Sequence, residues 1–427
     1  MFSLKNESRK TKVILSVILA VFFAVTMFTI FHYGNSTLLG SVETYNNDDV
    51  KYIRSAFTLL STGNLTYKAP SSPTVFIMPG LPYVLSFFMG IFGTWEGVTA
   101  FRVFQAILQT ASLLLVFFIG RKAFNSRVAL LAVLLNALYI PEVWVSNIII
   151  TETIFKFFFL MLIYFCLYAV EEKKLKYYIL GGIFWGLSAL FRPPIAAFPI
   201  VILIMWIKKK YKIGEIIKYT IVVSTIFVLI MSPWWLRNYR LYDKFIPFTA
   251  SSGNPMLQGT YIHYNDKDGS DAYIDSSSFK YSDDEQENNK VETDIAKLRM
   301  KTLIPKEPFK YLYWYTIGKT FINWILPFYL KEILGINHVL AALYHFILLC
   351  LAVRGTIFHI RKTKENYSFY LILYSVIYTN CIYLPFYCYS RYMYPAMPLV
   401  ILPASFMVFE IRQKMKIKNA LKLGESA

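Results

Sequence analysis

The chain has 427 residues, of which 56% are hydrophobic and only 16% are charged, and its mean hydropathy is +0.45. Soluble domains carry about 25% charged residues, so this composition excludes an ordinary soluble globular protein. The formal net charge of +18 comes from short basic runs between apolar segments, which is typical of the cytoplasmic loops of membrane proteins rather than of a nucleic-acid surface. We therefore expect an all-α polytopic membrane protein embedded in a lipid bilayer, with no nucleic-acid partner.

About ten apolar segments are predicted to cross the membrane, since a transmembrane helix needs about 20 apolar residues. They lie near residues 13–31, 97–120, 128–147, 152–170, 178–191, 195–207, 216–233, 338–353, 367–387 and 394–410. Two further apolar runs, 74–93 and 313–330, contain prolines or polar residues, and we interpret both as interfacial or re-entrant helices.

The basic runs support this count. With ten spans, every basic run between two apolar segments faces the cytoplasm, and so does the basic tail. Counting 74–93 as a further span would place the next three basic runs outside. These runs lie at residues 121–127, 173–176, 208–212, 361–364 and 412–422. We expect a multi-pass protein of the cell membrane with both termini in the cytoplasm.

This topology divides the chain into three parts. Residues 1–233 form an N-terminal transmembrane module that includes a first external loop, 32–96. Residues 234–337 form a large external loop with amphipathic helices, and residues 338–427 form the C-terminal transmembrane helices and a basic tail. All candidate functional residues then lie at or near the outer face.

The first external loop carries two adjacent acids, Asp48 and Asp49, followed by Tyr52. They stand at the start of a helical pattern that ends at Gly63. Acids at a helix N-terminus are favoured by the helix dipole and can cap the helix. The alternative is a general base held at the membrane surface, and the pattern alone leaves both interpretations open.

Two charged residues interrupt the apolar segments of the N-terminal module. Glu152 lies between two predicted spans, and Arg192 breaks the run 178–207 together with two prolines. Ionisable groups at membrane depth are costly and usually face protein or a water-filled cavity, and broken helices occur there where they line a cavity. Capping of the next helix by Thr151 is the structural alternative for Glu152, and charge pairing or anion contact is expected of Arg192.

Two aromatic-rich segments place arginines at span ends. Arg237 and Asn238 follow Pro233 at the end of one span, and Arg391 and Tyr392 open the last span. The aromatic residues fit an interfacial belt. The arginines indicate phosphate binding, because guanidinium binds phosphate through two parallel hydrogen bonds.

Several short elements follow one another along the chain: Asp48-Asp49 with Tyr52, Met78–Pro82, Gly120–Phe124, Thr151-Glu152, Arg192-Pro193, Pro233–Tyr239, Gly253-Asn254 with Gly259, and Arg391-Tyr392 with Pro395 and Pro398. In this order they resemble the GT-C superfamily of polytopic glycosyltransferases, and most closely the bacterial branch related to protein O-mannosyltransferases and to lipid A aminoarabinose transferase. One departure is Glu at position 152, where several relatives have Asp.

The resemblance implies a GT-C-type helix bundle that transfers a hexosyl or pentosyl group, with inversion, from a polyprenyl-phosphate-linked donor to a glycan, lipid or protein of the cell envelope. It implies Asp48 as general base, with Asp49 and Glu152 as further catalytic residues. The residues implied in binding the lipid phosphate or the sugar are Tyr52, Arg192, Arg237, Asn238, Arg391 and Tyr392. No cofactor and no metal ligand set are implied with certainty; if a divalent cation is used, Glu152 would help to hold it.

Two other classes of membrane protein compete with this interpretation. A flippase or transporter of lipid-linked sugars would also bury arginines and acids, but the two halves of the chain show no repeat of the kind common in transporters. A polymerase of lipid-linked sugars also has large outer loops, yet it would not need an acidic pair directly after the first span.

Overall fold

The computed structural model describes residues 2–275, 279–282, 284–363 and 365–424. Within these ranges the chain is built of helices, and the only extended pairing is an isolated β-bridge between Ile333 and Ile336. The prediction of an all-α protein is therefore confirmed for this part. Residues 276–278 and 283 of the predicted external loop, 364 of a predicted basic run and 425–427 of the predicted tail lie outside the described residues.

In the described part of the chain, six helical segments are long and apolar enough to cross a membrane. This confirms several apolar helices, but the predicted count of ten spans is not confirmed. The segments are built on α1 (Arg9–Tyr33), α4 (Thr94–Ala123), α7 (Glu152–Glu172), α10 (Ile213–Tyr242), α15 (His338–Lys362) and α18 (Met397–Gly424).

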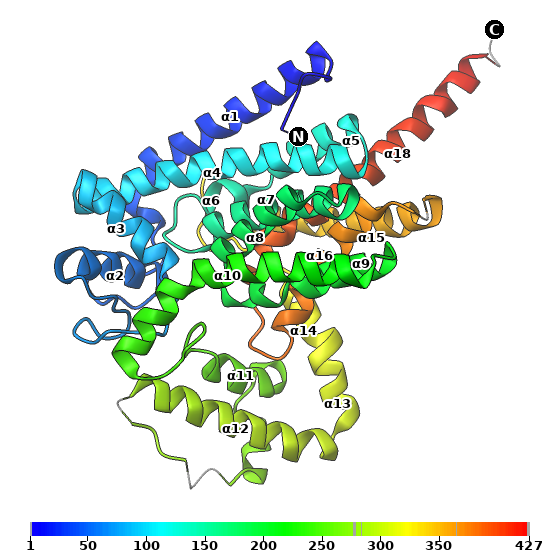
Figure 1. The fold of residues 1–427 in the computed structure, drawn as a ribbon. Helices are drawn as coiled ribbons and strands as arrows, with labels where there is room; N and C mark the ends of the chain where they lie inside the picture. The colour runs from blue at the N-terminus through cyan, green and yellow to red at the C-terminus, as the bar shows by residue number, and fades with distance from the viewer. Residues whose placement is uncertain (1, 276–278, 283, 364, 425–427) are drawn as a thin grey trace.

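These long helices form a bundle in which some are central and others peripheral (Figure 1). The apolar window of α7 is 78% buried within the protein, whereas that of α10 is only 11% buried. A helix that is apolar all round and buried belongs to the core, and an apolar helix that stays exposed is suited to contact with lipid. We therefore place α7 at the centre, with α4 and α18, and α1, α10 and α15 at the lipid-facing periphery.

The remaining predicted segments form shorter helices. The predicted end of the first-loop helix at Gly63 is confirmed, because Gly63 has φ 75° and caps α2 in a left-handed conformation that glycine adopts without steric cost. The shorter helices are α2 (Asp48–Thr62), α3 (Gly80–Phe92), α5 (Ser126–Ala137), α6 (Ile140–Trp144), α8 (Leu175–Ala189), α9 (Pro199–Lys208), α16 (Tyr367–Tyr383) and α17 (Ser390–Met393).

The predicted break at Arg192 is confirmed. Helix α8 ends at Ala189, a 3₁₀ turn covers Pro193–Ala197, and α9 then runs to Lys208. Proline cannot donate its backbone nitrogen and disfavours a helical residue before it, so Pro193 and Pro194 end the helix. The result is two short helices with Arg192 in the turn between them.

Pro233 has a different outcome from the one expected. The span was predicted to end there, but α10 continues through Pro233 to Tyr242. Proline has no N–H, so the carbonyl of Leu229 loses its usual helical donor. This carbonyl accepts a hydrogen bond from the Ser232 hydroxyl at 3.0 Å instead. Arg237 and Asn238 therefore lie inside a helix.

The segment predicted to form the second external loop is a helical layer beside the bundle (Figure 1). Asp284 caps its longest helix, α12 (Glu285–Lys306), by accepting hydrogen bonds from the backbone amides of Gln286 and Glu287. Buried Arg299 ties the layer together by donating to Thr260 and Ser270, each at 2.7 Å, and by pairing with Asp271. Its helices are α11 (Gly253–Thr260), α12 (Glu285–Lys306), α13 (Pro308–Tyr313) and α14 (Lys319–Trp324).

Candidate active site

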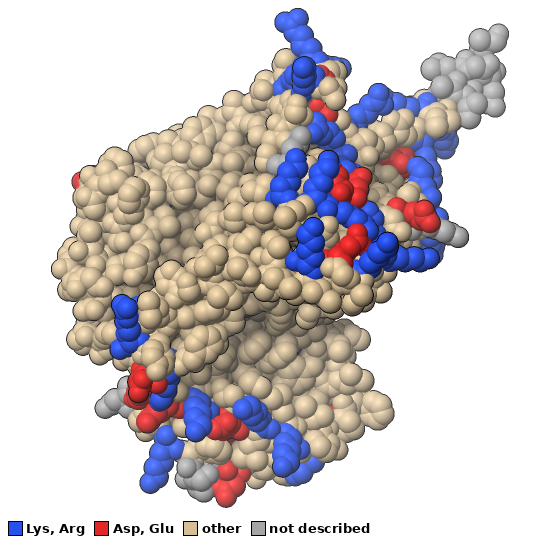
Figure 2. All heavy atoms as spheres, viewed as in Figure 1, with Lys and Arg blue, Asp and Glu red and all other residues tan. Residues whose placement is uncertain are grey.

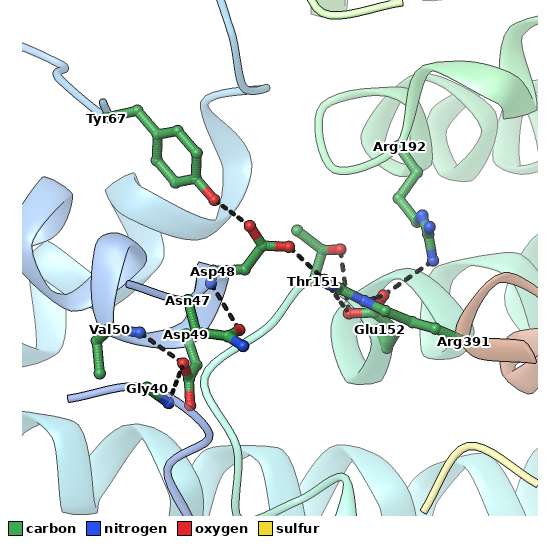
Figure 3. A network of polar contacts seen from close by, with 10 residues as sticks. All are labelled: Gly40, Asn47, Asp48, Asp49, Val50, Tyr67, Thr151, Glu152, Arg192 and Arg391. Atoms are coloured by element: carbon green, nitrogen blue, oxygen red, sulfur yellow. Dashed lines mark hydrogen bonds and ion pairs between the residues drawn. The ribbon is translucent and has the colours of Figure 1, made fainter. Parts of the chain in front are cut away.

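The two adjacent acids at the start of α2 point to different surroundings (Figure 3). Asp49 is fully buried, and its carboxylate accepts hydrogen bonds from the backbone amides of Leu39 at 2.6 Å, Gly40 at 3.3 Å and Val50 at 2.9 Å. Asp48 keeps 45% of its side chain exposed. Asp49 thus holds the preceding loop on the helix, while the carboxylate of Asp48 can reach another molecule.

Arg391 joins Asp48 to the first turn of α7. One terminal nitrogen of its guanidinium donates to Asp48 Oδ2 at 2.7 Å, Nε donates to Glu152 Oε1, and the other terminal nitrogen reaches Glu152 Oε2 at 3.3 Å. A guanidinium can do this because its five donors lie in one fixed plane. Arg391, from the start of the last predicted span, therefore links Asp48 of the first predicted loop to Glu152.

Glu152 is fully buried and has two further polar contacts. Arg192 donates to its Oε1 at 3.1 Å, and the hydroxyl of Thr151 lies 3.3 Å from its Oε2. Thr151 makes no side-chain capping bond to the helix, so the capping alternative for this residue is not seen. Figure 3 shows the resulting cluster of two carboxylates and two guanidinium groups, which we call the ion cluster: Asp48, Glu152, Arg192 and Arg391.

Two aromatic residues from the predicted set border the ion cluster. The Arg192 guanidinium lies 5.0 Å from the ring centre of Tyr392, and Tyr392 stacks on Tyr383 at 4.6 Å. Tyr52 is buried on α2 with its ring 5.3 Å from that of Tyr67. These rings form apolar walls beside the charges, and a cation next to an aromatic face is further stabilised there.

Tyr67 was not predicted from the sequence. Its hydroxyl donates to Asp48 Oδ1 at 2.6 Å, and its backbone carbonyl accepts a hydrogen bond from Arg54 at 2.6 Å. No sequence motif indicates Tyr67, because its contact with Asp48 depends on how the loop after α2 folds back onto the helix.

The electrostatic environment keeps Asp48 ionised. Burial by itself would raise the pKa of its carboxyl, but the Arg391 guanidinium, the Tyr67 hydroxyl and the Lys51 ammonium together hold that pKa below its usual 3.8. Burial and the neighbouring Tyr52 and Asp48 raise the pKa of Tyr67 well above its ordinary value, so Tyr67 stays protonated and donates. At neutral pH, Asp48 is therefore a carboxylate that can accept a proton.

A second buried ion pair lies next to the segment that carries Arg391. Lys156 pairs with Glu142, and its ammonium also donates to the hydroxyl of Tyr394 at 2.9 Å, to which Gln109 donates at 2.6 Å. Both charges fall inside predicted spans, where their cost at membrane depth could have marked them as significant from sequence. Tyr394 follows Arg391 closely in the chain, so this pair fixes the start of the last span.

Arg237 and Asn238 lie apart from these contacts. Arg237 donates to the backbone carbonyl of Thr74 at 2.8 Å and to the side-chain oxygen of Asn238 at 3.0 Å, with its guanidinium 5.0 Å from the ring centre of Trp234. Asn238 donates to the carbonyl of Ile246 at 3.1 Å. Both residues thus join α10 to neighbouring loops, and the structure does not bring them into the ion cluster.

Asp48 and Glu152 are the two carboxylates of the ion cluster, and they share Arg391 as their counter-charge. Among the described residues, no group of three or more His, Cys, Asp or Glu side chains lies close enough together to hold a metal ion.

Comparisons with known proteins agree with the fold. Residues 71–236 match the family model described as dolichyl-phosphate-mannose-protein mannosyltransferase. This matched segment contains Glu152 and Arg192, while Asp48 and Arg391 lie outside it. A comparison with curated proteins gave no match.

Several solved membrane-protein structures are similar. The oligosaccharyltransferase of Archaeoglobus fulgidus in its apo form superimposes with a TM-score of 0.57 at 16% identity, over 96% of this chain and 52% of that one. The archaeal oligosaccharyltransferase AglB from Archaeoglobus fulgidus, in complex with an inhibitory peptide and a dolichol-phosphate, gives a TM-score of 0.56 at 16% identity, over 98% of this chain and 52% of that one. ArnT from Cupriavidus metallidurans in the apo state gives a TM-score of 0.42 at 13% identity, over 92% of this chain and 77% of that one.

The chain spans about half the length of the archaeal oligosaccharyltransferase. At these identities the likeness concerns the fold. The expected resemblance to GT-C glycosyltransferases is thus confirmed by the family match over residues 71–236 and by a shared membrane helix bundle.

Proposed function

We propose that the chain is an integral-membrane glycosyltransferase that moves a sugar from a polyprenyl-phosphate-linked donor to a cell-envelope acceptor on the outer face. The observation that carries this proposal is the ion cluster, in which one half-exposed carboxylate and two arginines converge at the end of the central helix α7. The acceptor is a glycan, a lipid or a protein that offers a nucleophilic group.

In the proposed reaction Asp48 acts as general base. The acceptor oxygen attacks the anomeric carbon as the bond from that carbon to the phosphate oxygen breaks, so a single displacement inverts the configuration. The acceptor proton passes to the Asp48 carboxylate, whose low pKa keeps it ready at neutral pH. General-base groups of this kind contribute about 10²- to 10⁴-fold to the rate.

The arginines are suited to the leaving group. As the sugar departs, charge develops on the lipid phosphate, and fixed cations in a site poor in water stabilise it strongly. Arg391 and Arg192 supply two such cations, and the plane of each guanidinium fits two phosphate oxygens. Binding of the phosphate would draw Arg391 away from Asp48 and so release the base.

The orientation in the membrane is supported by α7. Glu152 begins this helix and Glu171 lies in its last turn, which places them about 28 Å apart at about 1.5 Å per residue, close to the thickness of a hydrocarbon core. The end near Glu171 carries Lys122, Lys173 and Lys209. Basic residues favour the cytoplasmic side, so we place the ion cluster on the outer side.

The similar proteins support the donor class. The matched family model is named for a dolichyl-phosphate-mannose-dependent transferase, and the archaeal AglB structure contains a dolichol-phosphate. A polyprenyl-phosphate donor carries the same chemistry, namely a sugar phosphate on a long isoprenoid chain.

Purified protein incubated with a radiolabelled polyprenyl-phosphate sugar and envelope extracts tests the proposal. Transfer of label to an acceptor together with release of free polyprenyl phosphate is the expected result. Movement of the intact lipid-linked sugar across vesicle membranes without release would identify a flippase, and growth of a lipid-linked chain would identify a polymerase. Repeating the assay with a chelator decides whether a divalent cation takes part.

A further inference from the structure

A second polar site lies at the opposite end of the bundle from the ion cluster. Figure 2 shows Lys and Arg gathered at the end of the bundle where α9 and α15 terminate, while the middle of the bundle surface is free of charge in this view. Two cavities open there, of about 390 and 380 Å³. Each falls in the range of pockets that hold small ligands, roughly 300–1,000 Å³.

The two cavities meet at shared residues. Both are lined by Val170 and Glu171 at the end of α7, by Lys209 after α9 and by Tyr367 at the start of α16. The ammonium of Lys209 lies 4.8 Å from the ring centre of Tyr367. We call the combined hollow the basic pocket.

Among the described residues, some of the lysines that line the basic pocket have a carboxylate partner, and others do not. Lys122 pairs with Glu171, and Lys173 pairs with Glu215 at 2.9 Å. Lys208, Lys209 and Lys210 also line the pocket, but in the described part of the chain they have no carboxylate within ion-pair distance. Lys209 and Lys208 instead donate to neutral oxygens, at 3.3 Å to the carbonyl of Val170 and at 2.7 Å to the hydroxyl of Tyr374.

The first turn of α16 adds neutral donors to the same wall. Asn366 caps this 17-residue helix by accepting a hydrogen bond from the backbone amide of Phe369, and Thr363, Glu365, Asn366 and Ser368 line the cavity. Glu365 and Glu171 are the two carboxylates among the described lining residues, against five lysines. Backbone amides at a helix N-terminus favour an anion. Leu167 and Val170 of α7 and Leu371 of α16 add apolar side chains to the same cavity.

We propose that the basic pocket binds the phosphate headgroup of an anionic bilayer lipid. Three lysines without carboxylate partners, hydroxyl groups and a helix N-terminus surround a cavity that also has apolar lining residues and lies at the end of the membrane-spanning helices. A headgroup phosphate would meet the lysines while its acyl chains pass the apolar residues into the bilayer. Polybasic segments at this depth attract anionic lipids, and the walled cavity restricts the contact to one lipid molecule. The site is separate from the proposed donor site, which lies at the other end of α7.

Native mass spectrometry of the detergent-purified full chain tests this, with phosphatidylglycerol as the anionic lipid and phosphatidylcholine as the neutral one. One tightly retained phosphatidylglycerol is expected. The double variant Lys209→Gln/Lys210→Gln should lose about tenfold or more of that affinity. The matched control is Lys176→Gln/Lys218→Gln, which removes the same charge at exposed positions on α8 and α10 that do not line either cavity, and it should bind as the unaltered protein does.

A second variant guards against a folding defect. Ser368→Asp places an acid in the first turn of α16, where it stabilises the helix, but it adds negative charge to the basic pocket and should abolish lipid retention. Equal losses in the lysine variant and its control would reduce the effect to general surface charge and overturn the proposal. Equally tight binding of glycerol phosphate or inorganic phosphate would identify a site for soluble phosphate and would also overturn it.

Discussion

At the level of single residues, the two adjacent acids of α2 differ in what they contact. Asp48→Asn should abolish transfer, with a loss of about 10²- to 10⁴-fold, while folding is preserved because this side chain is half exposed. Asp49→Asn should instead lower the free energy of unfolding by about 1–3 kcal/mol, since a buried acceptor of backbone amides is altered. Turnover assays and thermal unfolding of both variants in detergent measure the two effects. Small and equal losses of activity in the two variants would contradict the role of Asp48 as general base and favour helix capping instead.

Tyr67→Phe removes the hydrogen bond to Asp48 and leaves the ring in place. Because that bond helps to lower the pKa of Asp48, its loss should raise this pKa. In the unaltered protein the carboxylate form persists as pH falls until the lowered pKa is reached, so the acid limb of kcat/KM should lie below pH 3.8. The variant should show this limb at higher pH and a reduced kcat. Tyr45→Phe, whose ring lies over Arg54, is the control and should leave the profile in place.

Arginine-to-lysine changes compare two of the three arginines that the sequence analysis assigned to binding the lipid phosphate or the sugar. Arg391 contacts two carboxylates through three nitrogens, and lysine can reproduce its charge but not its plane. Arg391→Lys should therefore lower kcat by about 10- to 100-fold. Arg237→Lys tests whether Arg237, predicted to bind the lipid phosphate, does so from its position on α10. Full activity of both variants would remove both residues from the site.

The sequence predicted the members of the ion cluster because each is a charged residue in an apolar or loop setting where a charge is costly. It could not predict that Arg391 pairs with Asp48 and Glu152, because those pairings depend on how the last span packs against α7. Tyr67 has no such signal, since tyrosine is common throughout this chain. Arg237 has the same local pattern as Arg391, and only the path of α10 separates the two.

At the level of helices, the effect of a proline depends on its neighbours. Arg192-Pro193-Pro194 ends α8, as predicted, because two successive residues lack a donor. Pro233 does not end α10, because Ser232 supplies a hydroxyl to the free carbonyl. The lengths of spans were therefore less predictable than their existence, and several predicted spans became short helices of 10–17 residues.

The crossing of α15 and α18 offers a test of helix packing. At Gly355, an added Cβ would lie 2.0 Å from the carbonyl oxygen of Pro403 and 2.8 Å from its carbon, so the two helices approach through the missing side chain. Gly355→Ala should cost about 1–3 kcal/mol, as overpacking usually does, and should lower the thermal unfolding midpoint in detergent. Gly214→Ala, where nothing lies within 4 Å of the added Cβ, is the matched control and should leave the midpoint unchanged.

At the level of the whole molecule, the topology can be tested by labelling. In a variant without the native cysteines, a cysteine at exposed Lys267 should react with an impermeant maleimide on intact cells. A cysteine at exposed Lys176 should react only after the membrane is made permeable. The physical reason is the separation of the two ends of α7 across the bilayer. The reverse pattern would place the ion cluster inside and contradict the proposed outer-face reaction.

The two negative and two positive side chains of the ion cluster balance one another, and this affects how the site responds to ionic strength. Glu152 is fully buried and Arg192 and Arg391 are only 9% and 17% exposed, while Asp48 is the exposed member at 45%. Salt screens exposed charges over about 10 Å at 0.1 M and about 3 Å at 1 M, but it acts much less on buried pairs. The pairs between Glu152 and the two arginines should therefore persist at high salt, and the transfer proposed above should depend on salinity only through Asp48.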